Sequence, residues 1–236
     1  MESEFDTVAG STIATKLLEA HPETPILMLE AGPQVPMKDR RYWWDYVLYG
    51  RKAYDPCEDR DSDNPSVGGT PWHSNGSRTM MYGGSTVHWG GWSMRFKPED
   101  FYLKTNTGQG GDWPYAYDTL EPSYCRADEY LSVCGDDSDS ADRMVPASAQ
   151  NKNDPWRSKP YPMPPLPVKS SGVLLERGAR KMGWHPYPAP MAIASVPYKD
   201  RAACAHCGFC IGFGCEMQAK SSTLYTMIPE AEATGR

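Results

Sequence analysis

The sequence predicts an α/β fold that is rich in loops. Residues 11–20 carry small and apolar side chains at helical spacing, and residues 25–31 form a short continuous apolar run that is typical of a buried parallel strand. The chain of 236 residues contains 22 prolines and 21 glycines, which favour short regular elements joined by long connections. We therefore expect helices and strands to alternate at the N-terminus, with much irregular structure after them.

The N-terminal segment has the order strand, helix, strand, which is the order of a Rossmann-like dinucleotide-binding unit. Phe5–Val8 is the candidate first strand, and we expect it beside residues 25–31 in a parallel sheet with an open edge. Glu30 ends the second strand, where an acidic side chain accepts hydrogen bonds from a ribose. Only Gly10 remains of the glycine-rich turn that holds a pyrophosphate, so we expect weak phosphate binding. The alternative is that this segment is not a nucleotide unit.

Later segments predict further elements, and we divide the chain into domains at residues 1–135 and 136–236. Two amphipathic helices are expected at residues 117–133 and 168–182, and a strand without an identified partner at residues 223–228. Residues 40–54 predict an aromatic helix or lid. Residues 57–69 predict an acidic loop, and residues 136–153 form a polar segment.

The run Gly83–Trp92 is the most informative part of the chain. Two glycine pairs bracket Ser85, Thr86, His88 and Trp89, and a second tryptophan follows the second pair. Glycine pairs let the backbone approach a planar or phosphorylated ligand, because no Cβ stands in the way. Hydroxyls and an imidazole offer hydrogen bonds, and indoles offer flat walls. The run predicts either a loop pressed against a large aromatic cofactor or a glycine-rich turn with two buried tryptophans.

Four of the seven cysteines lie close together, as Cys204, Cys207, Cys210 and Cys215. Crowded thiols of this kind point to a metal or cluster site more readily than to a disulfide framework. Intervening glycines expose backbone amides that can donate hydrogen bonds to sulfur. Three alternatives remain open from the spacing: structural thiols or a loop disulfide, an iron–sulfur cluster, or a zinc site.

Composition excludes several classes of function. The net charge of −6 and the isoelectric point near 5.4 argue against a nucleic-acid-binding surface. No apolar run is long enough to span a bilayer. The acidic start carries no apolar signal-peptide region, so we expect a protein that is cytoplasmic or exported together with a partner subunit.

Four segments, taken in order, resemble the N-terminal half of the glucose–methanol–choline family of FAD-dependent oxidoreductases, and more particularly its bacterial sugar and sugar-acid dehydrogenases. The segments are Phe5-Asp6 with Ala9–Pro33, then Gly83–Phe101, Asp112–Tyr124, and Cys204–Lys220. They cover most of residues 5–135 and 168–228, and their combination is more specific than any single motif.

The resemblance implies an incomplete FAD-binding domain with part of an inserted substrate or cap region. It implies that Gly10 is the last glycine of the phosphate turn and that Glu30 binds the adenosine ribose. It also places the flavin or its diphosphate against Gly83, Gly84, Ser85 and Thr86, with His88 near the ring. Trp89 is a further expected cofactor-binding residue. A histidine at this place can bond covalently to flavin in relatives, but Val87 interrupts the motif here, and we expect a non-covalent cofactor.

The family oxidises an alcohol carbon while a C-terminal histidine takes the hydroxyl proton and hydride passes to flavin. None of the five histidines matches that residue, so we assign no catalytic residue and expect an N-terminal fragment that is inactive alone. The resemblance further implies an alcohol or sugar substrate, a non-oxygen acceptor, a cytochrome c-type partner, small accessory subunits and, as in some relatives, an iron–sulfur cluster in the cysteine-rich loop. The alternative is a non-enzymatic truncated protein or a small metal-binding electron-transfer module.

Overall fold

The computed structural model describes residues 7–30, 32–35, 42–51, 79–136 and 154–235. The chain divides into two compact units, one formed by Met1–Gly91 with Cys204–Arg236 and the other by Trp92–Ala203. The first unit joins segments from both ends of the chain. The boundary expected after residue 135 falls inside the second unit, and the division into two domains there stays a prediction.

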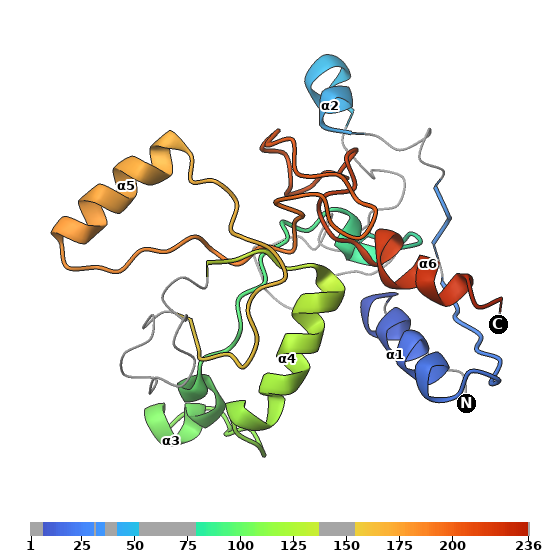
Figure 1. The fold of residues 1–236 in the computed structure, drawn as a ribbon, viewed down its shortest axis with the longest axis horizontal. Coiled ribbons are helices and arrows are strands. Elements are labelled where there is room, and N and C mark those ends of the chain that lie inside the picture. Colours follow the sequence, from blue (N-terminus) through green and yellow to red (C-terminus); the bar gives the residue numbers. More distant parts are fainter. Residues whose placement is uncertain (1–6, 31, 36–41, 52–78, 137–153, 236) are drawn as a thin grey trace, which may run out of the picture. The chain divides into compact units, whose positions relative to one another are not determined.

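The first unit is built around helix α1 (Thr7–Ala20), which packs against helix α6 (Met227–Glu232) (Figure 1). Ala14 and Leu18 of α1 are buried, as are Met227 and Ile228 of α6. The helix predicted over residues 11–20 is therefore confirmed, and it begins four residues earlier than expected. This unit also contains helix α2 (Trp43–Tyr49) and the 3₁₀ turns η3 (Gly84–Val87) and η6 (Thr223–Tyr225).

The predicted strands are not found in the described residues. Thr7 and Val8 belong to α1, so the expected strand at Phe5–Val8 is wrong at those two positions, and Phe5 lies outside the described residues. Residues 22–30 carry no regular secondary structure, and the bridges found among the described residues are isolated ones. A strand needs a neighbour to accept its backbone hydrogen bonds, and the expected neighbour is helical. A helix-rich, loop-rich chain is what the structure shows, and the Rossmann-like sheet is not confirmed.

The strand expected at Thr223–Ile228 is also wrong. Residues 223–225 form η6, and α6 begins at Met227. The hydroxyl of Ser222 accepts a hydrogen bond from Leu224 N at 3.3 Å and thereby caps the turn. This local cap favours a helical turn over the strand that the composition of the segment had predicted.

The second unit contains helices α3 (Leu103–Thr107), α4 (Tyr117–Leu131) and α5 (Ser170–Lys181), with the 3₁₀ turn η4 (Pro98–Tyr102). Both amphipathic helices expected from periodicity are confirmed as α4 and α5, and the aromatic segment at residues 40–54 contains α2 of the first unit. The expected loop at 57–69 and nearly all of the polar segment at 136–153 lie outside the described residues.

A buried ionic cluster stabilises the second unit. Asp128 accepts hydrogen bonds from Arg95, at 2.6 Å, and from Arg157. Glu121 pairs with Arg95 at 3.3 Å. Tyr117 donates to the Trp156 carbonyl at 2.7 Å, and burial raises its pKa to about 12. Buried charges persist only when paired, so this cluster fixes α4 against the segment that follows it.

No helix in the described ranges is long and apolar enough to cross a membrane.

Candidate functional site

The glycine loop (residues 83–91) turns sharply at its start. Gly83 has φ +102° and Gly84 has φ +56°, values that favour glycine. A Cβ on Gly83 would also lie 3.0 Å from Val87 Cγ1 and 3.1 Å from Leu224 Cβ. This glycine is therefore required both for its conformation and for the close packing of η3 against η6.

A cluster of buried hydroxyls holds the glycine loop in place. Thr86 Oγ1 donates to the Gly83 carbonyl at 2.6 Å and lies 2.9 Å from Ser222 Oγ. Thr223 donates twice into the loop, from its backbone N to Thr86 Oγ1 at 3.2 Å and from its hydroxyl to the Gly83 carbonyl at 3.2 Å. Thr86, which is expected to face a cofactor, is buried and holds the turn through these hydrogen bonds, and its contact with a cofactor stays a prediction.

Ser85 is tied to a different segment. Its hydroxyl accepts a hydrogen bond from Thr79 N at 3.2 Å. Thr79 Oγ1 is buried and has no hydrogen-bond partner among the described residues. A buried hydroxyl without a partner is uncommon, and it leaves one polar atom beside the loop available to a ligand.

His88 and Trp89 are half-buried at the end of η3. Burial lowers the pKa of His88, and the nearby positive charge of Lys220 lowers it further, so the imidazole is neutral at pH 7. The indole of Trp89 donates to the Ser221 carbonyl at 2.7 Å. The end of η3 is therefore followed by a neutral imidazole and by an indole that a hydrogen bond holds in place.

Lys220 joins the glycine loop to the cysteine loop (residues 204–220). Its side chain is buried, and Nζ donates to the carbonyls of Trp89 at 2.6 Å, Cys210 at 2.6 Å and Phe213 at 2.8 Å. Burial lowers the pKa of Lys220 to about 8. Sequence reasoning missed this residue, since a single lysine after a cysteine-rich segment has no distinguishing local pattern.

The cysteine loop does not gather its thiols into a metal site. Cys204, Cys207, Cys210 and Cys215 are free thiols, with Cys207 exposed and the others half-exposed. Across the described ranges, no three His, Cys, Asp or Glu side chains are grouped so that they could hold a metal ion. The expected iron–sulfur or zinc site therefore has no support from the structure.

Helix α2 covers the cysteine loop. The ring of Trp43 stacks on Phe209 with centroids 4.7 Å apart, and the indole of Trp44 donates to Glu216 at 2.9 Å. Tyr46 contacts Phe213 at 5.9 Å between centroids. The aromatic segment is thus used for packing within the first unit.

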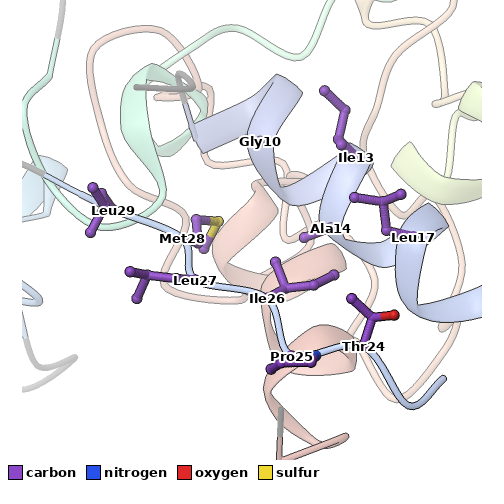
Figure 2. Close-up of a pocket in the computed structure, with 10 residues that line it drawn as sticks. All are labelled: Gly10, Ile13, Ala14, Leu17, Thr24, Pro25, Ile26, Leu27, Met28 and Leu29. Carbon is purple, nitrogen blue, oxygen red and sulfur yellow. The ribbon is translucent and has the colours of Figure 1, made fainter. Parts of the chain in front are cut away.

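Gly10 lies in α1, and Glu30 lies at the end of the segment that follows this helix. Gly10 is buried in the first turn of α1 and lines an apolar pocket of about 290 Å³ (Figure 2). The other walls are Ile13, Ala14 and Leu17 of the helix and residues 24–29. Glu30 Oε1 accepts a hydrogen bond from Gly32 N at 2.9 Å. Helix α1 also contacts η3, so these elements belong to one packed unit.

Comparison with known proteins identifies relatives of one kind. No family model matches the chain. The chain is 28% identical to the fructose dehydrogenase large subunit of Gluconobacter japonicus, over 97% of this chain and 42% of that protein. It is 31% identical to 6'''-hydroxyparomomycin C oxidase of Streptomyces lividus, over 66% of this chain and 26% of that protein. It is 27% identical to the gluconate 2-dehydrogenase flavoprotein of Pantoea cypripedii, over 62% of this chain and 27% of that protein. These relatives are oxidoreductases of the glucose–methanol–choline type, so the resemblance of the chain to that family is confirmed.

The chain spans less than half the length of each of those three relatives. Its glycine loop brings six of the expected cofactor residues together on η3 and the residues beside it: Gly83, Gly84, Ser85, Thr86, His88 and Trp89. Ser222, Thr223 and Lys220 hold that loop and were not predicted. The contacts of all these residues with FAD stay a prediction.

Proposed function

We propose that this chain is the flavin-binding part of an FAD-dependent oxidoreductase that oxidises a CH–OH group of an alcohol or sugar by hydride transfer to flavin, and that passes the electrons to an acceptor other than oxygen. Relatives named as dehydrogenases of fructose, gluconate and 2-methyl-1,2-propanediol support this substrate class. When bound, FAD would supply the two-electron acceptor for the hydride.

The observation that carries the proposal is the fixed glycine loop. The Thr86 hydroxyl holds the turn by a hydrogen bond to the Gly83 carbonyl. His88 and Trp89 lie on the same loop and are half-buried. The indole of Trp89 offers a planar surface, and the neutral imidazole of His88 can donate or accept one hydrogen bond. Thr79 Oγ1 offers a further polar atom. These residues fit an aromatic cofactor with polar edges.

The adenosine end of FAD has a separate candidate site. Gly10 lies in the first turn of α1, where backbone N–H groups have no partner within the helix. Glu30 ends the segment after that helix, and its carboxylate can accept hydrogen bonds from a ribose. We assign Gly10 to the phosphate turn and Glu30 to the adenosine ribose, in an incomplete Rossmann-like arrangement.

Further subunits are part of the proposal. One relative is named a large subunit, which supports a protein that works within a larger assembly. An electron acceptor of the cytochrome type and a small accessory subunit would be its partners.

The test compares FAD with FMN, which lacks the adenosine half. Purified chain is titrated with each cofactor while flavin fluorescence is followed. We expect Glu30→Gln to weaken FAD binding about tenfold, the effect of losing one charged hydrogen bond, and to leave FMN binding unchanged. Glu23→Gln, an exposed neighbour, is the matched control. Absence of saturable binding of either cofactor to the wild-type chain would overturn the proposal, and equal loss of FAD and FMN would remove the role of Glu30.

A further inference from the structure

Lys220 is a buried cation whose three donors are all used by backbone carbonyls. Two of those carbonyls, of Cys210 and Phe213, belong to the cysteine loop. The third belongs to Trp89 in the glycine loop, 131 residues earlier in the sequence. The side chain is 2% exposed, so water does not compete for these hydrogen bonds.

Among the described residues, no carboxylate forms an ion pair with Lys220. Its hydrogen bonds among the described residues go to neutral carbonyls. Burial lowers the pKa of Lys220, and a negative charge on the sulfur of Cys210, Cys215 or Cys207 acts in the opposite direction. A buried ammonium without a counter-ion costs free energy, and its three carbonyl partners offset that cost only while both loops stay in place. The position is therefore sensitive to any change in either loop.

We propose that Lys220 is a positioning residue that locks the glycine loop to the cysteine loop, so that FAD binding at the first loop protects the thiols of the second. The protection by FAD rests on the proposed function, whereas the lock between the loops does not. His88 and Trp89 lie in the segment that Lys220 holds, and Phe213 and Cys210 lie in the segment that carries the thiols.

The lock is tested by removing the ammonium and returning it. In the full chain carrying Lys220→Ala, n-propylamine replaces the missing three carbons and nitrogen of the side chain. Labelling of Cys210 and Cys215 by an alkylating reagent is followed by peptide mass spectrometry. Cys207, which is exposed in the intact loop, is the internal reference. The control variant is Lys181→Ala, at an exposed position in α5.

We expect Cys210 and Cys215 to react at least about tenfold faster in Lys220→Ala, the change that corresponds to losing one buried charged group. n-Propylamine should restore the slow rate, and the bulkier tert-butylamine should not. Lys220→Met, which fills the space without donors, serves if the alanine variant does not fold, and it should also react fast. Unchanged labelling rates in the substituted chain, or equal rescue by both amines, overturn the lock.

The link to the cofactor has its own readout. We expect FAD to slow labelling of Cys210 and Cys215 in the wild-type chain and to have no such effect in Lys220→Ala. If the wild-type chain does not bind FAD, the proposed function fails while the amine rescue still decides the lock. If FAD binds but protects both proteins equally, the coupling through Lys220 is wrong.

Discussion

Thr86 Oγ1 and Ser222 Oγ lie 2.9 Å apart, although 136 residues separate them in the sequence. Both side chains are buried. Through this contact the C-terminal segment fixes the turn of the glycine loop. The backbone N of Thr223 also donates a hydrogen bond to Thr86 Oγ1. The shape of the candidate cofactor site is thus set by residues remote in sequence from the loop that forms it.

Thr86→Val should destabilise the first unit. The substitution keeps the shape of the side chain but leaves the Ser222 hydroxyl and Thr223 N without their acceptor. A buried group left unsatisfied costs about 1–3 kcal/mol, and we expect a loss of that size in the free energy of unfolding in urea. Thr119→Val, at an exposed position on α4, should change it little. Equal stability of the two variants would show that the hydroxyl cluster does not hold the loop.

Asp128→Asn should strongly destabilise the second unit. Asp128 pairs with both Arg95 and Arg157 in a buried position, and loss of its charge leaves two guanidinium groups with one fewer anion. Breaking a buried pair of this kind costs about 3–5 kcal/mol. The neighbouring Glu129→Gln removes an exposed pair with Lys159 and should have little effect. Thermal unfolding of the two variants compares them, and similar midpoints would be inconsistent with a structural role for the cluster.

Tyr117 should contribute to stability in a pH-dependent way. Burial raises its pKa from 10.0 to about 12 in the folded chain. A raised pKa stabilises the fold below pH 10, and this contribution is lost as pH rises to about 12. Between these values the wild-type chain should lose about 2–3 kcal/mol more stability than Tyr117→Phe, a difference that follows from the shift of the pKa. Urea unfolding at a series of pH values measures the difference, and parallel curves would contradict it.

The apolar pocket between α1 and residues 24–29 should accept a larger side chain. Ala14 lines this pocket and is buried. Ala14→Leu adds three carbons inside a space of about 290 Å³. Burial of these groups should raise the free energy of unfolding by about 1–2 kcal/mol. Ala20→Leu, at the exposed end of the same helix, corrects for helix propensity. A loss of stability in Ala14→Leu alone would mean that the pocket closes in solution.

Helices in this chain could be predicted because their signal is local. The apolar positions of α4 and α5 recur at helical spacing, and no distant residue is needed to form the backbone hydrogen bonds. The strand expected at residues 25–31 depends on a neighbour, and Thr7 and Val8, which should supply it, are helical. A single sequence does not show whether such a partner forms.

The candidate site likewise contains residues that a local pattern predicts and residues that no local pattern predicts. The composition of Gly83–Trp92 predicted a tight loop, because glycine pairs and neighbouring hydroxyls are a local pattern. The residues that fix the loop, Ser222 and Lys220, act across more than a hundred residues and have no local signal. The cysteine spacing suggested a metal site, but spacing alone does not determine whether thiols converge.

The most direct test of the central claim, that the glycine loop binds FAD in the conformation described, is an FAD titration of two glycine variants. Gly83 and Gly108 both have positive φ, +102° and +75°, but only at Gly83 would a Cβ meet neighbouring side chains. Energy transfer from tryptophan to flavin reports binding. We predict saturable binding by the wild-type chain and Gly108→Ala, and at least about tenfold weaker binding by Gly83→Ala. No binding by the wild-type chain, or equal binding by both variants, would contradict the account.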